Sequence, residues 1–137
     1  MIERKDLKLA LKNMINWTYQ QQAFARKLKG ALSRGEWAKE YCTVKYSLPR
    51  QSGHTTMIRE LCKEEFFERP ALFVPLETML GNYNRSIVGG RLHVASATEL
   101  VDDGVKEVII DSSSFVSKET IETMYKFFNA KLFLLIQ

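Results

Sequence analysis

The stretch YCTVKYSLPRQSGHTT, residues 41–56, decides the fold of this chain. Residues 42–47 predict a short buried strand, and Gly53 predicts a tight turn because glycine adopts the backbone conformations that such a turn requires. Thr55 and Thr56 then predict the first turn of a helix. A strand, a glycine turn and a helix start in this order are typical of a loop that surrounds an anion, because the free N–H groups of the helix point toward it.

Strands and helices alternate along the rest of the chain. The predicted strands are 71–76, 91–96, 107–111 and 131–137, and the predicted helices are 55–67, 118–129 and a short helix or turn over 77–83. Ser117 is the expected N-cap of the last helix. Apolar strands separated by helices favour a parallel sheet covered on both faces, so we expect an α/β protein with a three-layer parallel sheet. Ligands bind beyond the carboxyl ends of such strands, and this end holds the loop at 48–55, Glu77, Asp111 and Gln137.

The first forty residues carry the positive charge of the chain. They hold nine Lys or Arg residues against four Asp or Glu residues, whereas the formal net charge of the whole chain is +4. Apolar residues recur at helical spacing from about Lys5 to Leu32, in one helix or two. We therefore expect a basic N-terminal helical arm over 1–38 and a compact domain over 39–137. The arm suits nucleic acid as a partner, and a solvated helix face is the equally open alternative.

Residues 47–56, SLPRQSGHTT, resemble the Walker A motif of phage terminase large subunits and related RecA-like motor ATPases, typically written G-P-R-Q-x-G-K-T-T. Residues 108–111, VIID, look like a Walker B strand, which is apolar and ends in aspartate. Residues 132–137 fall where this family has its coupling or sensor strand. The resemblance covers roughly Lys39 to the C-terminus, leaves the basic arm outside, and implies a P-loop NTPase-like fold.

The resemblance also implies a role for individual residues, with ATP and Mg²⁺ as cofactors. The phosphates would be held by Ser52, Gly53, His54, Thr55 and Thr56. Mg²⁺ would be held by Thr55 and, through water, by Asp111. Arg50 could reach a terminal phosphate with its guanidinium fork, and Gln137 could orient water or sense the γ-phosphate. The implied catalytic residues are therefore Asp111, Gln137 and Arg50.

The chain departs from the family motif at three positions. Leu48 replaces the first glycine, His54 replaces the lysine that lies between phosphates, and Ser112 replaces the glutamate that activates water. Histidine is shorter than lysine and only partly charged near neutral pH. The resemblance therefore implies a small nucleotide-binding protein similar to a motor ATPase core, phage-encoded and linked to DNA metabolism or packaging, with weak or no hydrolysis alone.

Two other interpretations stay open. In one, the fold is kept as a scaffold without catalysis, and its surface binds nucleic acid or a host protein. In the other, the chain is a flavodoxin-like or receiver-like domain, and its acidic residues, Asp102, Asp103 and Asp111, have no role in holding a nucleotide. A motor also needs groups from a neighbouring subunit or domain, so a protein partner or a homo-oligomer is expected for the first interpretation.

The composition sets further limits. No apolar run is long enough to span a membrane and no secretory signal opens the chain, so we expect a cytoplasmic protein (in the host cytoplasm if viral) with no membrane partner. Cys42 and Cys62 are expected to be reduced core residues. The two histidines, His54 and His93, have no clustered cysteines to support a zinc site.

Overall fold

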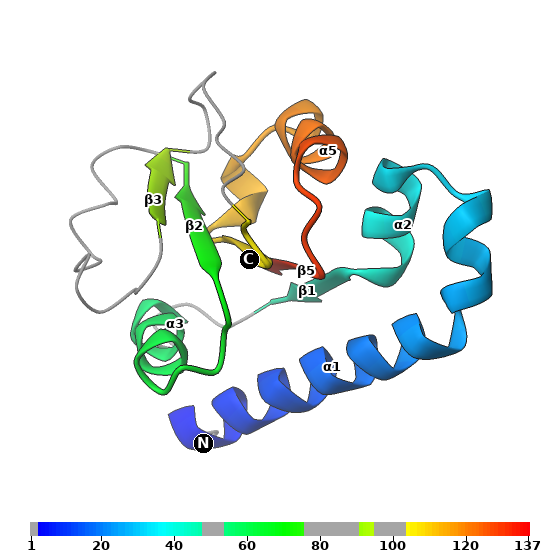
Figure 1. Ribbon diagram of the computed structural model, residues 1–137. Coiled ribbons are helices and arrows are strands. Elements are labelled where there is room, and N and C mark those ends of the chain that lie inside the picture. Colours follow the sequence, from blue (N-terminus) through cyan, green and yellow to red (C-terminus); the bar gives the residue numbers. More distant parts are fainter. Residues whose placement is uncertain (1–2, 48–53, 76–90, 95–103) are drawn as a thin grey trace.

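A computed structural model describes residues 3–47, 54–75, 91–94 and 104–137 of the chain (Figure 1). The loop at 48–53, the helix or turn expected over 77–83, and the acidic pair at 102–103 lie outside these residues. No helix within the described ranges has the length and apolar character that a membrane crossing requires.

The core of the fold is a sheet of five parallel strands in the order β1-β5-β4-β2-β3. The strands are β1 (Thr43–Tyr46), β2 (Pro70–Val74), β3 (Arg91–Val94), β4 (Glu107–Ile110) and β5 (Leu132–Ile136). All residues of β2, β4 and β5 are buried, as expected for strands covered on both faces. The prediction of an α/β fold with a parallel sheet is therefore confirmed.

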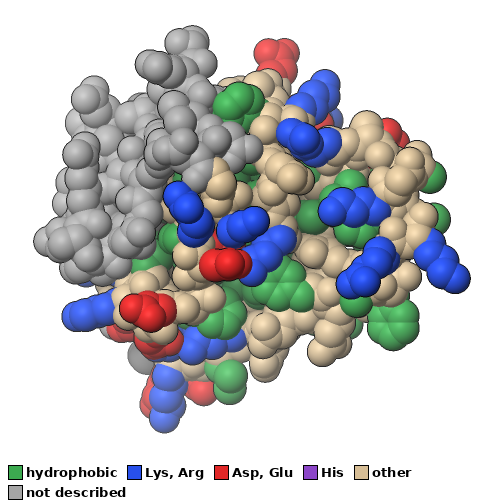
Figure 2. Space-filling view, in the orientation of Figure 1, with side chains coloured by type: hydrophobic (Ala, Val, Ile, Leu, Met, Phe, Trp, Pro, Cys, Tyr) green, Lys and Arg blue, Asp and Glu red, His purple; other side chains and the backbone are tan. Residues whose placement is uncertain are grey.

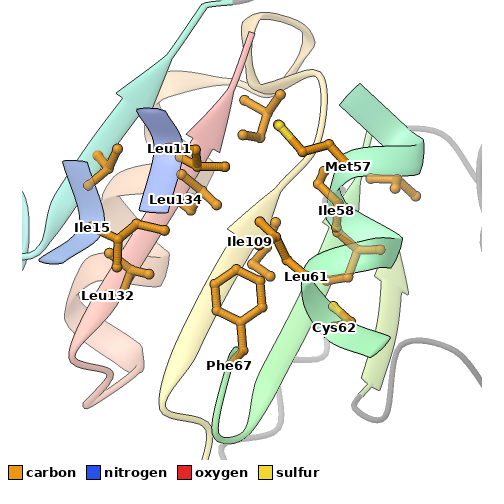
Figure 3. Close-up of a cluster of buried hydrophobic side chains, with 14 residues drawn as sticks. Leu11, Ile15, Met57, Ile58, Leu61, Cys62, Phe67, Ile109, Leu132 and Leu134 are labelled. Atoms are coloured by element: carbon orange, nitrogen blue, oxygen red, sulfur yellow. The ribbon is translucent and has the colours of Figure 1, made fainter. Parts of the chain in front are cut away.

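Helices cover both faces of the sheet (Figure 1). On one face lie α1 (Arg4–Phe24) and α3 (His54–Lys63), whose apolar residues form one core cluster with alternate residues of the strands. Figure 3 shows Met57, Ile58 and Leu61 of α3 beside Ile109 of β4 in this cluster. On the other face lie α2 (Arg34–Tyr41) and α5 (Lys118–Phe127), which bury Ala38, Met124 and Tyr125 in a second cluster.

Helix α1 belongs to this core. Leu11 and Ile15 are fully buried against the sheet, and the Tyr46 hydroxyl donates a hydrogen bond to the Leu7 carbonyl oxygen at 2.8 Å. After α1 comes a 3₁₀ helix, η1 (Arg26–Ala31), and then α2. The expected boundary between a basic arm and a compact domain, at 38/39, falls inside α2, and α1 covers one face of the sheet.

Local signals explain where the helices begin and end. Ser33 and Glu36 form a capping box at the start of α2, and Ser117 caps α5, as predicted, by accepting the Thr120 N–H at 3.1 Å. Helix α3 ends four residues before the predicted position. Glu65 adopts a left-handed conformation with φ of 58°, and the N–H groups of Glu65 and Phe66 bond back to the carbonyls of Cys62 and Leu61. This pattern is a Schellman motif with glutamate where glycine is usual.

Candidate functional site at the carboxyl edge of the sheet

The parallel strands end together at one edge of the sheet, called here the carboxyl edge. Ser47 follows β1, Asp111 follows β4 and Gln137 follows β5, so the strand order brings these three residues to the same edge. Strand β5 lies between β1 and β4. Because neighbouring strands are about 4.8 Å apart, the ends of β1 and β4 are separated by about 10 Å.

Gln137 is tied to the strand that precedes the glycine loop. Its backbone N–H donates to the Tyr46 carbonyl at 3.0 Å, and its side-chain Oε1 accepts a hydrogen bond from the Ser47 hydroxyl at 3.0 Å. Both Ser47 and Gln137 are exposed to solvent. The side-chain amide of Gln137 is thus held at the edge through its Oε1, and among the described residues no hydrogen bond from its Nε2 is seen.

Asp111 is the buried acid of this edge, only 1% exposed. Its backbone N–H donates to the Phe73 carbonyl at 2.9 Å, which continues the pairing of β4 with β2. The next residue, Ser112, adopts a left-handed backbone conformation with φ of 52° and ψ of 47°, and its hydroxyl lies 3.5 Å from Asp111 Oδ1. Non-glycine residues in this conformation are strained and are found disproportionately at functional sites.

The turn after Asp111 holds a second unusual group. The Ser113 hydroxyl is buried and has no hydrogen-bond partner among the described residues. A buried polar group without a partner is uncommon and calls for an explanation, such as a ligand or water that satisfies it. The segment from Asp111 to Ser113 therefore combines a buried carboxylate, a strained backbone and an unsatisfied hydroxyl.

Helix α3 begins at His54, as the sequence predicts for the helix after the glycine loop. Thr55 and Thr56 lie in its first turn and are half-buried. The N–H groups of a first turn have no partner within the helix and carry a partial positive charge. Three predicted site residues, Arg50, Ser52 and Gly53, lie outside the described residues, and only the backbone of His54 is described.

The connections of the sheet leave the carboxyl edge toward both faces. Helix α3 follows β1 and packs on one face, whereas α5 follows β4 and packs on the other face. In open α/β sheets, a crevice forms where successive connections leave for opposite faces, and ligands bind there. In this sheet the connections that leave for opposite faces start from β1 and β4, on either side of β5.

The donor set at this edge fits Mg²⁺ better than a transition metal. The predicted ligands, Thr55 and Asp111, offer oxygen atoms, which Mg²⁺ prefers, and Mg²⁺ in nucleotide sites takes most of its ligands from water and phosphate. Within the described ranges there is no group of three or more His, Cys, Asp or Glu side chains that could hold a metal by itself. A metal at this edge would therefore arrive with a phosphate ligand.

The strand order excludes the flavodoxin-like or receiver-like interpretation. A flavodoxin-like sheet has the order 2-1-3-4-5, in which the first strand lies between the second and the third. In this protein β2 pairs with β3 and β4, and β1 pairs with β5. The flavodoxin-like or receiver-like interpretation is wrong, because non-local pairing places the last strand beside the first.

Comparisons with protein-family models, with curated proteins and with solved structures give no significant match for this chain. The class that the structure defines is an α/β protein with a parallel five-stranded sheet.

The sequence patterns missed a second feature, at the opposite, amino edge of the sheet. A hollow of about 570 Å³ lies there, lined by residues that include Arg26, Lys29, Arg34, Trp37, Lys106 and Lys131. Lys106 directly precedes β4 and Lys131 directly precedes β5. Since the starts of parallel strands share one edge, two lysines immediately before apolar strands are the sequence signal that could have revealed it.

Proposed function

We propose that this protein binds a nucleoside triphosphate with Mg²⁺ at the carboxyl edge, as a small P-loop protein that resembles a motor ATPase core. The motif at 47–56 supports this proposal, and so does the start of α3 immediately after it. The observation that carries it is the strand order, in which β5 alone separates β1, the strand before α3, from β4, the strand that ends at buried Asp111. The resemblance to terminases adds a phage origin and a role in DNA metabolism or packaging.

Each group at the edge would have a distinct task. The first turn of α3 offers unpaired N–H groups and a positive dipole end to the phosphates. The Thr55 hydroxyl and the Asp111 carboxylate would hold Mg²⁺, directly and through water, and the metal would neutralise phosphate charge. Gln137 would contribute its Nε2 donors to a water or a phosphate oxygen, while Ser47 holds its Oε1 in place.

Two residues differ from the family motif in ways that should slow the hydrolysis of ATP. His54 stands where the family has a permanently charged lysine, and a nearby phosphate would raise its pKa without making it equivalent to lysine. Ser112 stands where the family has the glutamate that activates water, and a neutral hydroxyl cannot take that proton. The proposed activity is therefore binding, with slow or no turnover by the isolated chain.

Thermal unfolding in the presence of Mg²⁺-ATP tests the proposal. At a ligand concentration of about 100 times Kd, binding stabilises the folded state by about 2.7 kcal/mol, which raises Tm by several degrees for a domain of this size. We expect Thr55→Ala and Asp111→Asn to lose the part of this rise that depends on Mg²⁺, and Thr123→Ala, on the exposed side of α5, to keep it. Absence of any rise at millimolar Mg²⁺-ATP would refute nucleotide binding.

The second candidate function is that of a non-catalytic binding module on the same scaffold. The observation that favours it is Ser112, which leaves the position after Asp111 without a base. His54→Lys separates the two candidates. If the pocket is a nucleotide site, the added charge should tighten ATP binding about tenfold, because a hydrogen bond to a charged group contributes roughly 1.5–3 kcal/mol. An unchanged affinity would place the protein in the second class.

A further inference from the structure

The structure divides the basic N-terminal segment into two parts. In the first part, Lys8 and Lys12 of α1 form ion pairs with Glu64, the residue that follows α3, and Lys8 also reaches Glu60 of α3 at 3.4 Å. These lysines therefore fasten α1 to α3 and add little positive potential. In the second part, Arg26 and Lys29 of η1 form no ion pair within the described residues. Lys106, which precedes β4 and lies outside the N-terminal segment, also forms none among them. The available positive charge thus collects at the amino edge.

The amino-edge pocket is the hollow introduced above, between the end of α1, η1, the start of α2 and the segments that lead into β4 and β5. Five of its lining residues are cationic: Arg26, Lys29, Arg34, Lys106 and Lys131. Its acidic lining residue, Glu68, is already paired with Lys131 at 2.9 Å, and that pair lowers the pKa of the Glu68 carboxyl. Figure 2 shows Lys and Arg side chains gathered across the middle of this face and toward η1 and α2.

Two aromatic rings line the pocket among these cations. Lys29 Nζ lies 5.7 Å from the centre of the Trp37 ring, and Lys131 Nζ lies 5.4 Å from the centre of the Tyr19 ring. Burial raises the pKa of the Tyr19 phenol, with a smaller contribution from the Glu107 charge, so the ring stays neutral. Positive charges interleaved with aromatic rings are the combination that binds the phosphates and bases of single-stranded nucleic acid.

Exposed residues next to the pocket-lining ones in the sequence could extend the binding surface to a polymer. Ala23 lines the pocket, and the next residue in the sequence, Phe24 at the end of α1, is 85% exposed. Lys27, on η1, is also exposed. The hollow itself has the size of a small-molecule site. A ligand that fills it and also reaches Phe24 and Lys27 must be longer than one nucleotide.

We propose that the amino-edge pocket binds single-stranded nucleic acid, with phosphates against Arg26, Lys29, Arg34 and Lys106 and with a base stacked on Phe24. This site lies at the opposite edge of the sheet from the proposed nucleotide site and does not depend on it.

Fluorescence anisotropy with labelled oligothymidylate of about 12 nucleotides, a length that one small domain can cover, tests the proposal. The double variant Lys29→Ala/Lys106→Ala removes two pocket cations that form no ion pair among the described residues. It should weaken binding about tenfold or more and reduce the slope of log Kd against log salt by about 1.4, for two lost phosphate contacts. The matched control, Lys45→Ala/Lys118→Ala, removes the same charge from exposed positions on β1 and α5 and should bind as the unaltered protein does.

Phe24→Ala tests stacking, and because Phe24 is exposed the variant should fold normally by circular dichroism. We expect about fivefold weaker binding or more. Equal losses in the pocket and control double variants would overturn the proposal, because they would show only general attraction to a basic surface. Thymidine monophosphate that competes as strongly as the oligomer would overturn the polymer assignment. Thermal stabilisation by Mg²⁺-ATP should be unchanged in all of these variants, which separates this site from the carboxyl edge.

Discussion

Glu107, the first residue of β4, accepts a hydrogen bond from the backbone N–H of Arg69 at 2.9 Å through one carboxylate oxygen. Its other oxygen accepts the Glu68 N–H at 3.1 Å and lies 3.7 Å from Lys131 Nζ. The residue is only 1% exposed, so a buried acid holds the segment that leads into β2, including Glu68, which lines the amino-edge pocket.

Replacing this carboxylate by an amide should weaken the fold. In Glu107→Gln, one oxygen becomes an NH₂ group that faces a backbone N–H, so a buried donor loses its acceptor. We expect a loss of about 1–3 kcal/mol in the free energy of unfolding, measured by urea denaturation. Glu119→Gln, on the exposed surface of α5, is the control and should change little. A Glu107→Gln protein as stable as the original would show that these two hydrogen bonds contribute nothing.

Glu65→Gly should stabilise the protein. Glu65 holds a left-handed conformation at the end of α3, where glycine has no steric penalty. We expect a gain of about 0.5–1 kcal/mol after the greater entropy of glycine in the unfolded chain is subtracted. Lys63→Gly, two residues earlier inside the helix, should have the opposite effect because glycine is a poor helix former. The two midpoints of urea unfolding should therefore move in opposite directions from that of the unaltered protein.

The ion pairs between α1 and Glu64, the residue that follows α3, should make stability depend on pH on the acid side. Hydrogen bonds from Lys12 and then Lys8 hold the pKa of Glu64 below its usual value of 4.5. A carboxyl with a lowered pKa in the folded state contributes stability above its unfolded pKa, and this contribution is lost as pH falls through the folded pKa. Glu64→Gln should therefore flatten the fall in Tm below about pH 4.5. Because Glu64 is exposed, the change should be small, and an acid limb as steep as that of the unaltered protein would contradict it.

The two cysteines should be unreactive in the folded protein. Both are free and buried, and burial raises the pKa of each thiol to about 11, with a smaller contribution from Glu107 at Cys62. Near pH 8 almost no thiolate is present, and the thiolate is the reactive form. A colorimetric disulfide reagent should label neither residue until denaturant is added. Rapid labelling of the native protein would mean that one of these thiols reaches solvent.

Most of the local structure could be predicted from the sequence, but the pairing of the strands could not. Apolar strands such as 107–110 and 132–136 could be recognised because strands buried on both faces lack alternation. Their order could not, since β5 enters between β1 and β4 through contacts across nearly the whole chain. Helix α2 was not predicted as a separate helix, although the capping box of Ser33 and Glu36 is a local signal for it.

At the candidate sites, too, features set by nearby residues could be predicted from the sequence, and features set by distant contacts could not. The start of α3 and the place of Asp111 at the end of a strand follow from patterns within a few residues. Which basic residues are paired depends on residues far away in the sequence. Lys12 meets Glu64 only after the sheet has formed. Lys106 and Lys131 come close to Arg26 only through the parallel alignment of β4 and β5. Charge counted along the chain therefore overestimated the basic surface of α1 and overlooked the amino edge.

The position of β5 has a consequence for how the protein is made. Of the strands that the structure describes, the ribosome releases β1 first and β5 last, yet β5 pairs with β1 and joins it to β4. A nascent chain that has emerged only to about residue 130 therefore holds an orphaned first strand, and the two halves of its sheet cannot close. Closure of the sheet must await the release of β5, and until then an apolar edge is open to chaperones and to other nascent chains.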